Sequence, residues 1–302
     1  MARRIRTIGV IIVVLWIAGA LLLWIGQGRH NQLSVDFDAQ YPPGQTFQPG
    51  EILASAFIVV MEHELQSRFG WRPNDFFLWG PRLWADNNSY RQLGILQAVR
   101  ESLRVFKDHL TKVSSNEYDP DLLEADTLFR NDAERLWLPS AESRFRQGVE
   151  RLQDYVSGLR DGSPRSRPIT TRNVELVRLF QAWSDLLGDA HANLYKEQEA
   201  DGRSVWLQTD RYFYHAQGFA HAQYVLLLAL KREYHQLLTV KPVMQTLFDE
   251  AAEALKRAAE MNPFMILNGS PSGLFANHRR NLDAYIIEAR QKIYSIREEL
   301  EK

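Results

Sequence analysis

The chain has 302 residues, of which 45% are hydrophobic and 24% are charged, and this composition is ordinary for a folded globular protein. It contains no cysteine, which excludes disulfides, iron–sulfur clusters, thiolate zinc sites and covalently attached haem. Apart from the arginines at positions 3, 4, 6 and 29, 32 basic residues face 37 acidic ones, a net charge of −5. A body of that sign has no general attraction for nucleic acid, so no nucleic-acid partner is expected.

The first predicted element is a membrane anchor. Residues Ile8 to Ile25 form an uncharged run of eighteen residues. As a helix rising about 1.5 Å per residue, the run spans roughly 27 Å, which is enough to cross a bilayer. Arginines precede it at positions 3, 4 and 6. By the positive-inside rule we expect residues 1–7 in the cytoplasm, contact with the lipid bilayer through Ile8 to Ile25, and Trp24 near the outer interface.

The alternative to an anchor is a cleaved signal peptide. Ala18-Gly19-Ala20 resembles a cleavage site for signal peptidase, but the apolar run continues beyond it through Ile25. An uncleaved anchor is therefore the favoured prediction, and everything after the span is expected outside the cytoplasm.

Residues 26–50 are predicted to be a spacer between the membrane and a folded domain at 51–302, because Pro42-Pro43-Gly44 and Pro49-Gly50 interrupt regular structure there. Beyond them, apolar residues recur every three or four positions, as in the stripes from Leu96 to Leu110 and from Leu282 to Leu300. We predict an all-α fold, in which an N-terminal transmembrane helix is followed by a multi-helix bundle domain. Further helices are expected at 51–69, 140–160, 171–199 (capped by Thr170 or Thr171), 208–239 and 241–261 (with Pro242 in its first turn).

Short stretches that disfavour helix separate these elements, at Asn116 to Pro120, Asp161 to Pro168 and Ala200 to Arg203. The stretch at 161–168 is either a hinge between two helical halves or a surface loop. Its shortness favours the loop.

Aromatic residues are concentrated between Trp71 and Tyr90. Trp71, Trp79 and Trp84 lie within this segment. Such rings can stack on sugars, which suggests glycan or peptidoglycan as a ligand, or they can rest at a bilayer interface. The competing interpretation, which we favour, is that a long irregular segment needs large apolar anchors to stay packed.

The segment FMILNGSPSGLFANHRR, at 264–280, joins two predicted helices and raises the question of a phosphate site. It lacks the lysine and the preceding strand of a Walker-type loop. Asn268 lies in a turn-forming stretch, and Asn277 is predicted to cap the last helix, with His278 beside it. We interpret the segment as a packed turn in which Leu274 and Phe275 are buried; the alternative is a clamp for a ligand or partner.

The histidines and carboxylates give no recognisable active site. Glu62-His63-Glu64 does not fit the HExxH pattern, and His215, His221 and His235 have no metal-ligand spacing along a helix. No catalytic residue, metal ligand or cofactor site is therefore predicted. Glu62 or Glu64 could still serve as the single acid of a lytic transglycosylase, although a solvated helix face is the commoner role for such residues.

Several stretches resemble one family. They are LWADNNSYRQLGILQAVRES from Leu83, YDPDLLEADTLF from Tyr118, WLPSAESRFRQGVERLQDY from Trp137, VWLQTDRYFYHAQGFAHAQYVLLLAL from Val205 and MILNGSPSGLFANH from Met265. These blocks are similar to those of a proteobacterial family of membrane-anchored proteins, domain of unknown function 2333. The segment at 161–204 departs from the pattern. The resemblance implies a bacterial inner-membrane anchor and a helical periplasmic domain, and it implies no activity or site residues.

The sequence thus favours a single-pass inner-membrane protein whose helical domain is a non-catalytic interaction or scaffold module of the envelope. Its expected partners are the bilayer and other envelope proteins. The alternative is a protein that binds or cleaves cell-wall glycan. The candidate interaction residues are Trp71, Trp79, Trp84, Asn268, Asn277 and His278.

Overall fold

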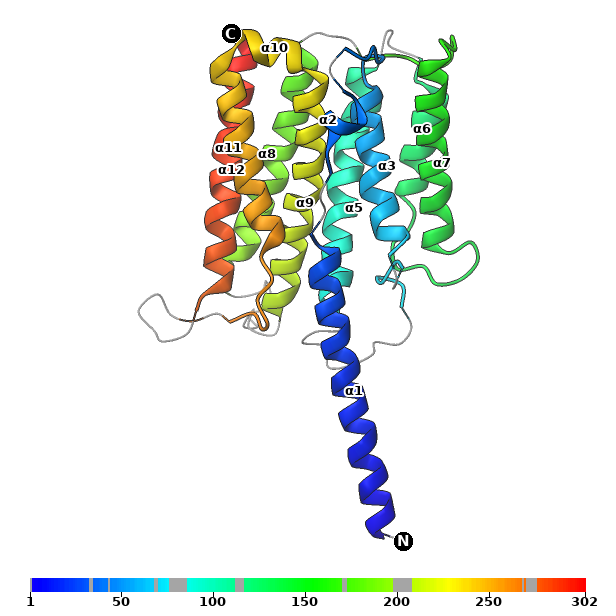
Figure 1. The fold of residues 1–302 in the computed structure, drawn as a ribbon, viewed down its shortest axis with the longest axis vertical. Coiled ribbons are helices and arrows are strands. Elements are labelled where there is room, and N and C mark those ends of the chain that lie inside the picture. Colours follow the sequence, from blue (N-terminus) through cyan, green and yellow to red (C-terminus); the bar gives the residue numbers. More distant parts are fainter. Residues whose placement is uncertain are drawn as a thin grey trace.

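The predicted fold class is confirmed. The structure is a computed structural model that describes residues 2–32, 35–42, 44–67, 70–75, 86–111, 117–169, 173–197, 208–267, 269 and 276–302, and over these ranges every regular element is helical. A long N-terminal helix projects from one end of an upright bundle, and the C-terminus lies at the other end (Figure 1).

The elements follow the chain in a simple order. They are α1 (Ala2–His30), α2 (Phe37–Gln40), α3 (Glu51–Leu65), α5 (Asn87–Val105), which continues into the π-helical turn η1 (Phe106–Leu110), α6 (Pro120–Phe129), α7 (Ala141–Arg160), α8 (Asn173–Tyr195), α9 (Thr209–Glu233), α10 (His235–Val240), α11 (Pro242–Glu260) and α12 (His278–Glu301).

The bundle has two groups of helices that share one core. Helices α8, α9, α11 and α12 form one group, and α3, α5, α6 and α7 form the other (Figure 1). The groups meet along α5 and α9, where Gly94 and Gly218 let the backbones approach closely. A Cβ atom built on Gly94 would lie 2.1 Å from the carbonyl oxygen of His215, and one on Gly218 would lie 2.1 Å from that of Arg91. Only glycine fits at this crossing.

Local signals explain most helix ends. Asn277 caps α12 as predicted, because its Oδ1 accepts from the backbone NH of Arg280 at 3.0 Å. Pro242 begins α11, also as predicted. Helix α6 was not predicted, although Asp119 caps it through two backbone NH groups and Pro120 opens it. An acidic cap followed by proline is a helix start, which the interpretation of Asn116 to Pro120 as a stretch that disfavours helix overlooks.

The stretch predicted to be one helix at 208–239 forms two helices, and the chain turns at Tyr234 between them. The last two residues of α9 bind other segments at this point. The Arg232 side chain donates to the carbonyl oxygen of Tyr41, and the Glu233 carboxylate accepts from the first turn of α3. These tertiary contacts are invisible in the helical periodicity of the sequence.

Residues 26–50, the predicted spacer, pack in part against the domain. Helix α1 continues to His30, and Gln27 and Asn31 are buried. Farther along, the side chains of Phe37 and Tyr41 are only 3% and 5% exposed, so they belong to the core of the domain. Outside α1 and α2, the described backbone of this segment is irregular, and the buried aromatic side chains hold it against the bundle.

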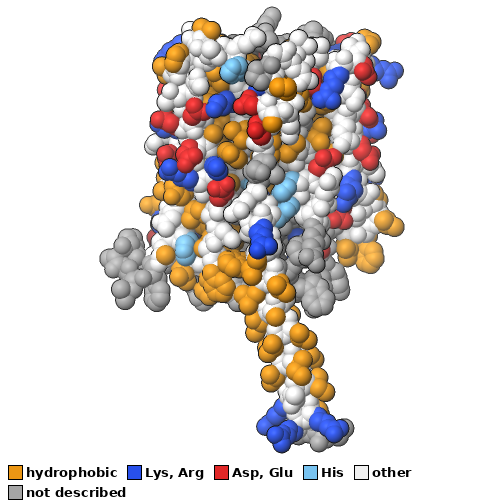
Figure 2. Space-filling model, in the orientation of Figure 1, with side chains coloured by type: hydrophobic (Ala, Val, Ile, Leu, Met, Phe, Trp, Pro, Cys, Tyr) orange, Lys and Arg blue, Asp and Glu red, His pale blue; other side chains and the backbone are white. Residues whose placement is uncertain are grey.

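Helix α1 has two distinct parts. Its N-terminal part is apolar and exposed, with Val10 and Leu15 more than 60% accessible. Its C-terminal part lies against the bundle from Ala20 onward, where the ring of Trp24 meets that of Phe264 edge-on at 5.3 Å. The helix is long and apolar enough to cross a membrane. Figure 2 shows this apolar surface ending in basic side chains at the tip.

Candidate functional site

A buried polar cluster lies where α1, α3, α5 and α9 meet. Its members are His30 at the end of α1, His63 and Glu64 in the last turns of α3, Arg91 in α5 and His221 in α9. Glu64 and Arg91 are 0% exposed, which is rare for charged side chains. The glycine crossing of α5 and α9 creates the cluster, because it presses Arg91 against the helix that carries His221.

Glu64 and Arg91 form the charged centre of this cluster. The Arg91 guanidinium donates to Glu64 Oε1 at 2.9 Å, and Gln92 Nε2 donates to Oε2 at 3.2 Å. Burial by itself would raise the pKa of the Glu64 carboxyl, but the positive charge of Arg91 holds that pKa well below its usual range. Glu64 is therefore a carboxylate, and the pair is electrically balanced.

The hydrogen bonds fix the tautomer of His221. The second Arg91 amino group lies 2.9 Å from His221 Nδ1, and a guanidinium can only donate, so Nδ1 accepts. The ring is then neutral with its hydrogen on Nε2, and Nε2 is buried without a hydrogen-bond partner. Burial and the neighbouring Arg91 charge both lower the pKa of His221 well below its usual value.

His30 and His63 connect helix α1 to this centre. Their rings are stacked with centroids 3.8 Å apart and planes 2° from parallel. His63 Nε2 donates to the backbone carbonyl of His30 at 2.7 Å, and His30 Nε2 lies 3.7 Å from Glu64 Oε2. Burial is the main cause that lowers the pKa of His63. The end of α1 is thus held by α3 through side-chain stacking and hydrogen bonding.

The cluster does not have the geometry of a metal centre, although potential ligand atoms of His30, His63 and Glu64 lie within 4.8 Å of one another. Imidazole lone pairs lie in the ring planes, and the planes of His30 and His63 are parallel, so the lone pairs do not converge on one ion. The Glu64 carboxylate is already neutralised by Arg91, whose positive charge would repel a divalent cation.

Among the described residues, the cavity that borders the cluster is too small for an organic substrate. The cavity that Arg91 shares with the end of α1 measures about 10 Å³ and is lined mainly by polar side chains, among them Gln27, Asn31 and Asn88. A cavity of that size and polarity suits one water molecule. The described side chains of the cluster therefore connect α1, α3, α5 and α9.

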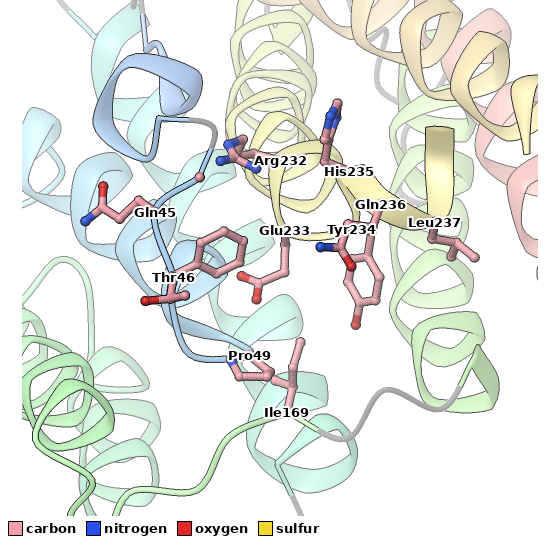
Figure 3. Close-up of a pocket in the computed structure, with 12 residues that line it drawn as sticks. Gln45, Thr46, Pro49, Ile169, Arg232, Glu233, Tyr234, His235, Gln236 and Leu237 are labelled. Atoms are coloured by element: carbon pink, nitrogen blue, oxygen red, sulfur yellow. The ribbon is translucent and has the colours of Figure 1, made fainter. Parts of the chain in front are cut away.

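A larger hollow lies at the end of the bundle away from the projecting part of α1. It measures about 690 Å³, between the segment that carries Gln45 and Thr46 and the junction of α9 and α10 (Figure 3). At one side, the Glu233 carboxylate accepts from the backbone NH groups of Gly50, Ile52 and Leu53 at 2.7 to 3.2 Å. Burial raises the pKa of Glu233 to about 7, against the effect of these donors. The hollow is open and mixed in polarity.

The structure assigns a packing role to Trp71. The residue is 1% exposed, its ring packs edge-on against Phe145, and its indole NH donates to the carbonyl of Ala133 at 2.8 Å. A ring in this position cannot stack on a sugar. Trp79, Trp84 and Asn268 lie outside the described residues, as do Leu274 and Phe275.

Asn277 and His278 close the base of the loop that begins at Phe264. Besides capping α12, Asn277 donates through Nδ2 to the carbonyl of Gly269 at 2.7 Å. The backbone NH of Leu267 donates to His278 Nδ1 at 3.0 Å, and the NH of His278 donates back to the Leu267 carbonyl. Both side chains are therefore engaged in holding the ends of the loop together.

The sequence analysis does not predict that His30, Arg91 and His221 belong to one cluster. Their partners come from four helices far apart in the chain, so no local spacing reveals them. One signal was available in α3, where Phe57, Val60, Met61 and Glu64 share one helical face. A carboxylate on an otherwise apolar stripe predicts a buried cation as its partner.

Comparison with known proteins adds a family and no activity. No curated protein and no solved structure gives a match. The profile of a bacterial family, described as an uncharacterized protein conserved in bacteria (DUF2333), matches residues 2–197 and 174–302. The two matched segments overlap inside the stretch 161–204, where the sequence departs from the expected pattern. Because together they cover nearly the whole chain, the protein belongs to this family.

Proposed function

We propose that the protein is a non-catalytic scaffold of the bacterial envelope, anchored in the inner membrane by α1 and carrying its helical domain in the periplasm. Three arginines precede the apolar part of α1, which supports a cytoplasmic N-terminus. The domain follows on the other side of the span.

One observation carries this proposal, namely that the anchor and the domain form one continuous body. Helix α1 runs without a break from its exposed apolar part to His30, which lies in the buried cluster. A tethered enzyme needs only a flexible linker, whereas a scaffold benefits from a fixed orientation relative to the membrane. The stacked rings of His30 and His63 and the hydrogen bond from His63 to the His30 carbonyl supply that fixation.

The hollow at the far end of the bundle is the proposed contact site for a partner protein. It faces away from the projecting part of α1, and it presents side chains of both polar and apolar type, including Thr46, Phe47 and Gln236 (Figure 3). Such a mixture is typical of sites that bind a protein segment without covalent chemistry. The glycan alternative has less support, because Trp71 is buried and Glu64 is paired with Arg91.

Two experiments on the full chain test the proposal. A reporter that is active only outside the cytoplasm, fused after Lys302, should be active, and activity of a cytoplasmic reporter at that position would contradict the proposed topology. A photo-crosslinking residue placed at Gln236, in the hollow, should capture a discrete protein partner in cells. The same residue at Glu298, an exposed position on α12, is the matched control and should capture none. Equal products at both positions would refute the assignment of the partner site.

A further inference from the structure

The free part of α1 is shorter than a bilayer. Arg6 is the last charged residue of α1 before the apolar run. The first buried residue of the helix is Ala20, which is 0% exposed. Fourteen residues at about 1.5 Å each give roughly 21 Å, whereas the hydrocarbon core of a bilayer measures about 30 Å. Beyond Ala20, the side chains of Leu22 and Ile25 are still 70% and 46% exposed, so the apolar surface of the helix continues alongside the domain.

The end of the domain that surrounds α1 carries exposed apolar side chains. In the loop between α6 and α7, Trp137 is 78% and Leu138 is 91% exposed. In the loop after α11, Phe264 is 50% and Met265 is 38% exposed. Both loops lie at the end from which α1 projects (Figure 1), and Figure 2 shows hydrophobic side chains in separate patches at this end. Exposed aromatic and aliphatic groups on a common face mark an interaction surface.

We call the surface formed by Trp137, Leu138, Phe264 and Met265 the base of the domain. We propose that the base is embedded in the interfacial region of the outer leaflet of the same bilayer that α1 crosses. The inference rests on the proposed anchoring of α1. The missing length of about 9 Å, taken from the rise per residue and the usual core thickness, is then made up by the base and not by thinning of the membrane.

We assign lipid and not a second protein to this surface, because a helix that crosses the bilayer places the neighbouring part of the domain next to lipid. Leu22 and Ile25 are on the span itself, and Phe264 contacts Trp24 of that span, so the apolar surface of the loop after α11 is continuous with the apolar surface of the anchor. Trp137 adds an aromatic ring of the kind enriched at membrane interfaces. The acidic balance of the chain beyond the leader provides no electrostatic attraction to anionic lipids, so the contact should be insensitive to salt.

The absence of native cysteine makes the test direct. Trp137→Cys and Phe264→Cys, each in the full chain, are labelled with an environment-sensitive dye and reconstituted in phosphatidylcholine vesicles. Val243→Cys is the matched control, because Val243 is 63% exposed and lies at the opposite end of the bundle. Dyes at 137 and 264 should show blue-shifted emission and several-fold stronger quenching by lipids that carry a shallow spin label, and both effects should persist in high salt. Dye at 243 should show neither.

The outcomes separate this inference from the proposed function. Resistance of the unlabelled chain to extraction from the vesicles by alkaline carbonate reports on α1 alone. If the chain is extracted, the proposed anchoring fails. If it is retained while the dyes at 137 and 264 behave like the dye at 243, the anchor stands and the embedded base is refuted. Retained folding of each labelled variant, checked by circular dichroism, ensures that either result is interpretable.

Discussion

Replacing Arg91 by leucine should destabilise the domain strongly. The substitution leaves the Glu64 carboxylate at 0% exposure without its guanidinium partner, and it removes the donor to His221 Nδ1. Loss of one partner from a buried ion pair costs about 3 to 5 kcal/mol of unfolding free energy. Replacing both partners, as in Arg91→Leu with Glu64→Leu, removes the stranded charge and should recover most of that loss, because a buried pair is worth little compared with apolar packing.

The assay is urea unfolding of the detergent-solubilised full chain, followed by far-ultraviolet circular dichroism. The matched control is Arg257→Leu, which breaks the ion pair between Arg257 and Glu253 on α11. Both of these side chains are more than half exposed, so the control should change stability by less than about 1 kcal/mol. The reasoning that the charged centre is closed to water would be refuted if Arg91→Leu shifted the urea midpoint no more than Arg257→Leu does.

Three further predictions concern the same framework. Because burial lowers the folded-state pKa of His63 and His221, the stability that these histidines contribute should be complete above about pH 6.5 and decline as pH falls below it. Glu233 acts in the opposite sense, because its raised pKa makes stability fall as pH rises toward 7. The Glu233 contribution is common to the parent and to His221→Gln, so the difference between their pH profiles isolates His221, and the decline below about pH 6.5 should be shallower for His221→Gln. Gly94→Ala should cost about 1 to 3 kcal/mol in urea unfolding, because its Cβ would meet a backbone oxygen at 2.1 Å, whereas Gly188→Ala, which meets only the flexible Arg290 side chain, should be tolerated. Asn277→Ala should cost about 0.5 to 2 kcal/mol through loss of the α12 cap, and an unchanged midpoint would show that the cap contributes nothing.

The helical fold was predictable because its signals are local. The apolar stripe at 282–300 lies inside α12, and each of its core residues from Leu282 to Ile296 is fully buried. The proline that opens α11 and the asparagine that caps α12 also act within one turn of themselves. Where the fold departs from prediction, the cause is tertiary. Phe37 and Tyr41 bind the supposed spacer to the bundle from the two ends of α2, and a helix of four residues is too short to give a periodic signal in the sequence.

The candidate site was much less predictable than the fold. His30 lies after the apolar run, in a segment interpreted as spacer, and its partner Glu64 lies in another helix. Their encounter depends on how far α1 extends and on the close approach of two glycines, neither of which a single sequence reveals. By contrast, the packing role of Trp71 could be anticipated, because a long irregular segment requires apolar anchors.

The central claim is that the anchor and the domain form one rigid body, and a distance measurement between them tests it most directly. Spin labels on Leu22→Cys and Glu260→Cys, at the end of α11, report the position of α1 relative to the bundle in reconstituted full-length protein. Labels on Glu150→Cys and Glu260→Cys, both within the domain, provide the reference width. Pulsed electron paramagnetic resonance should give one narrow distance distribution for the first pair, as narrow as that of the reference. A broad distribution for the first pair alone, as a flexible spacer at 26–50 would produce, would contradict the account.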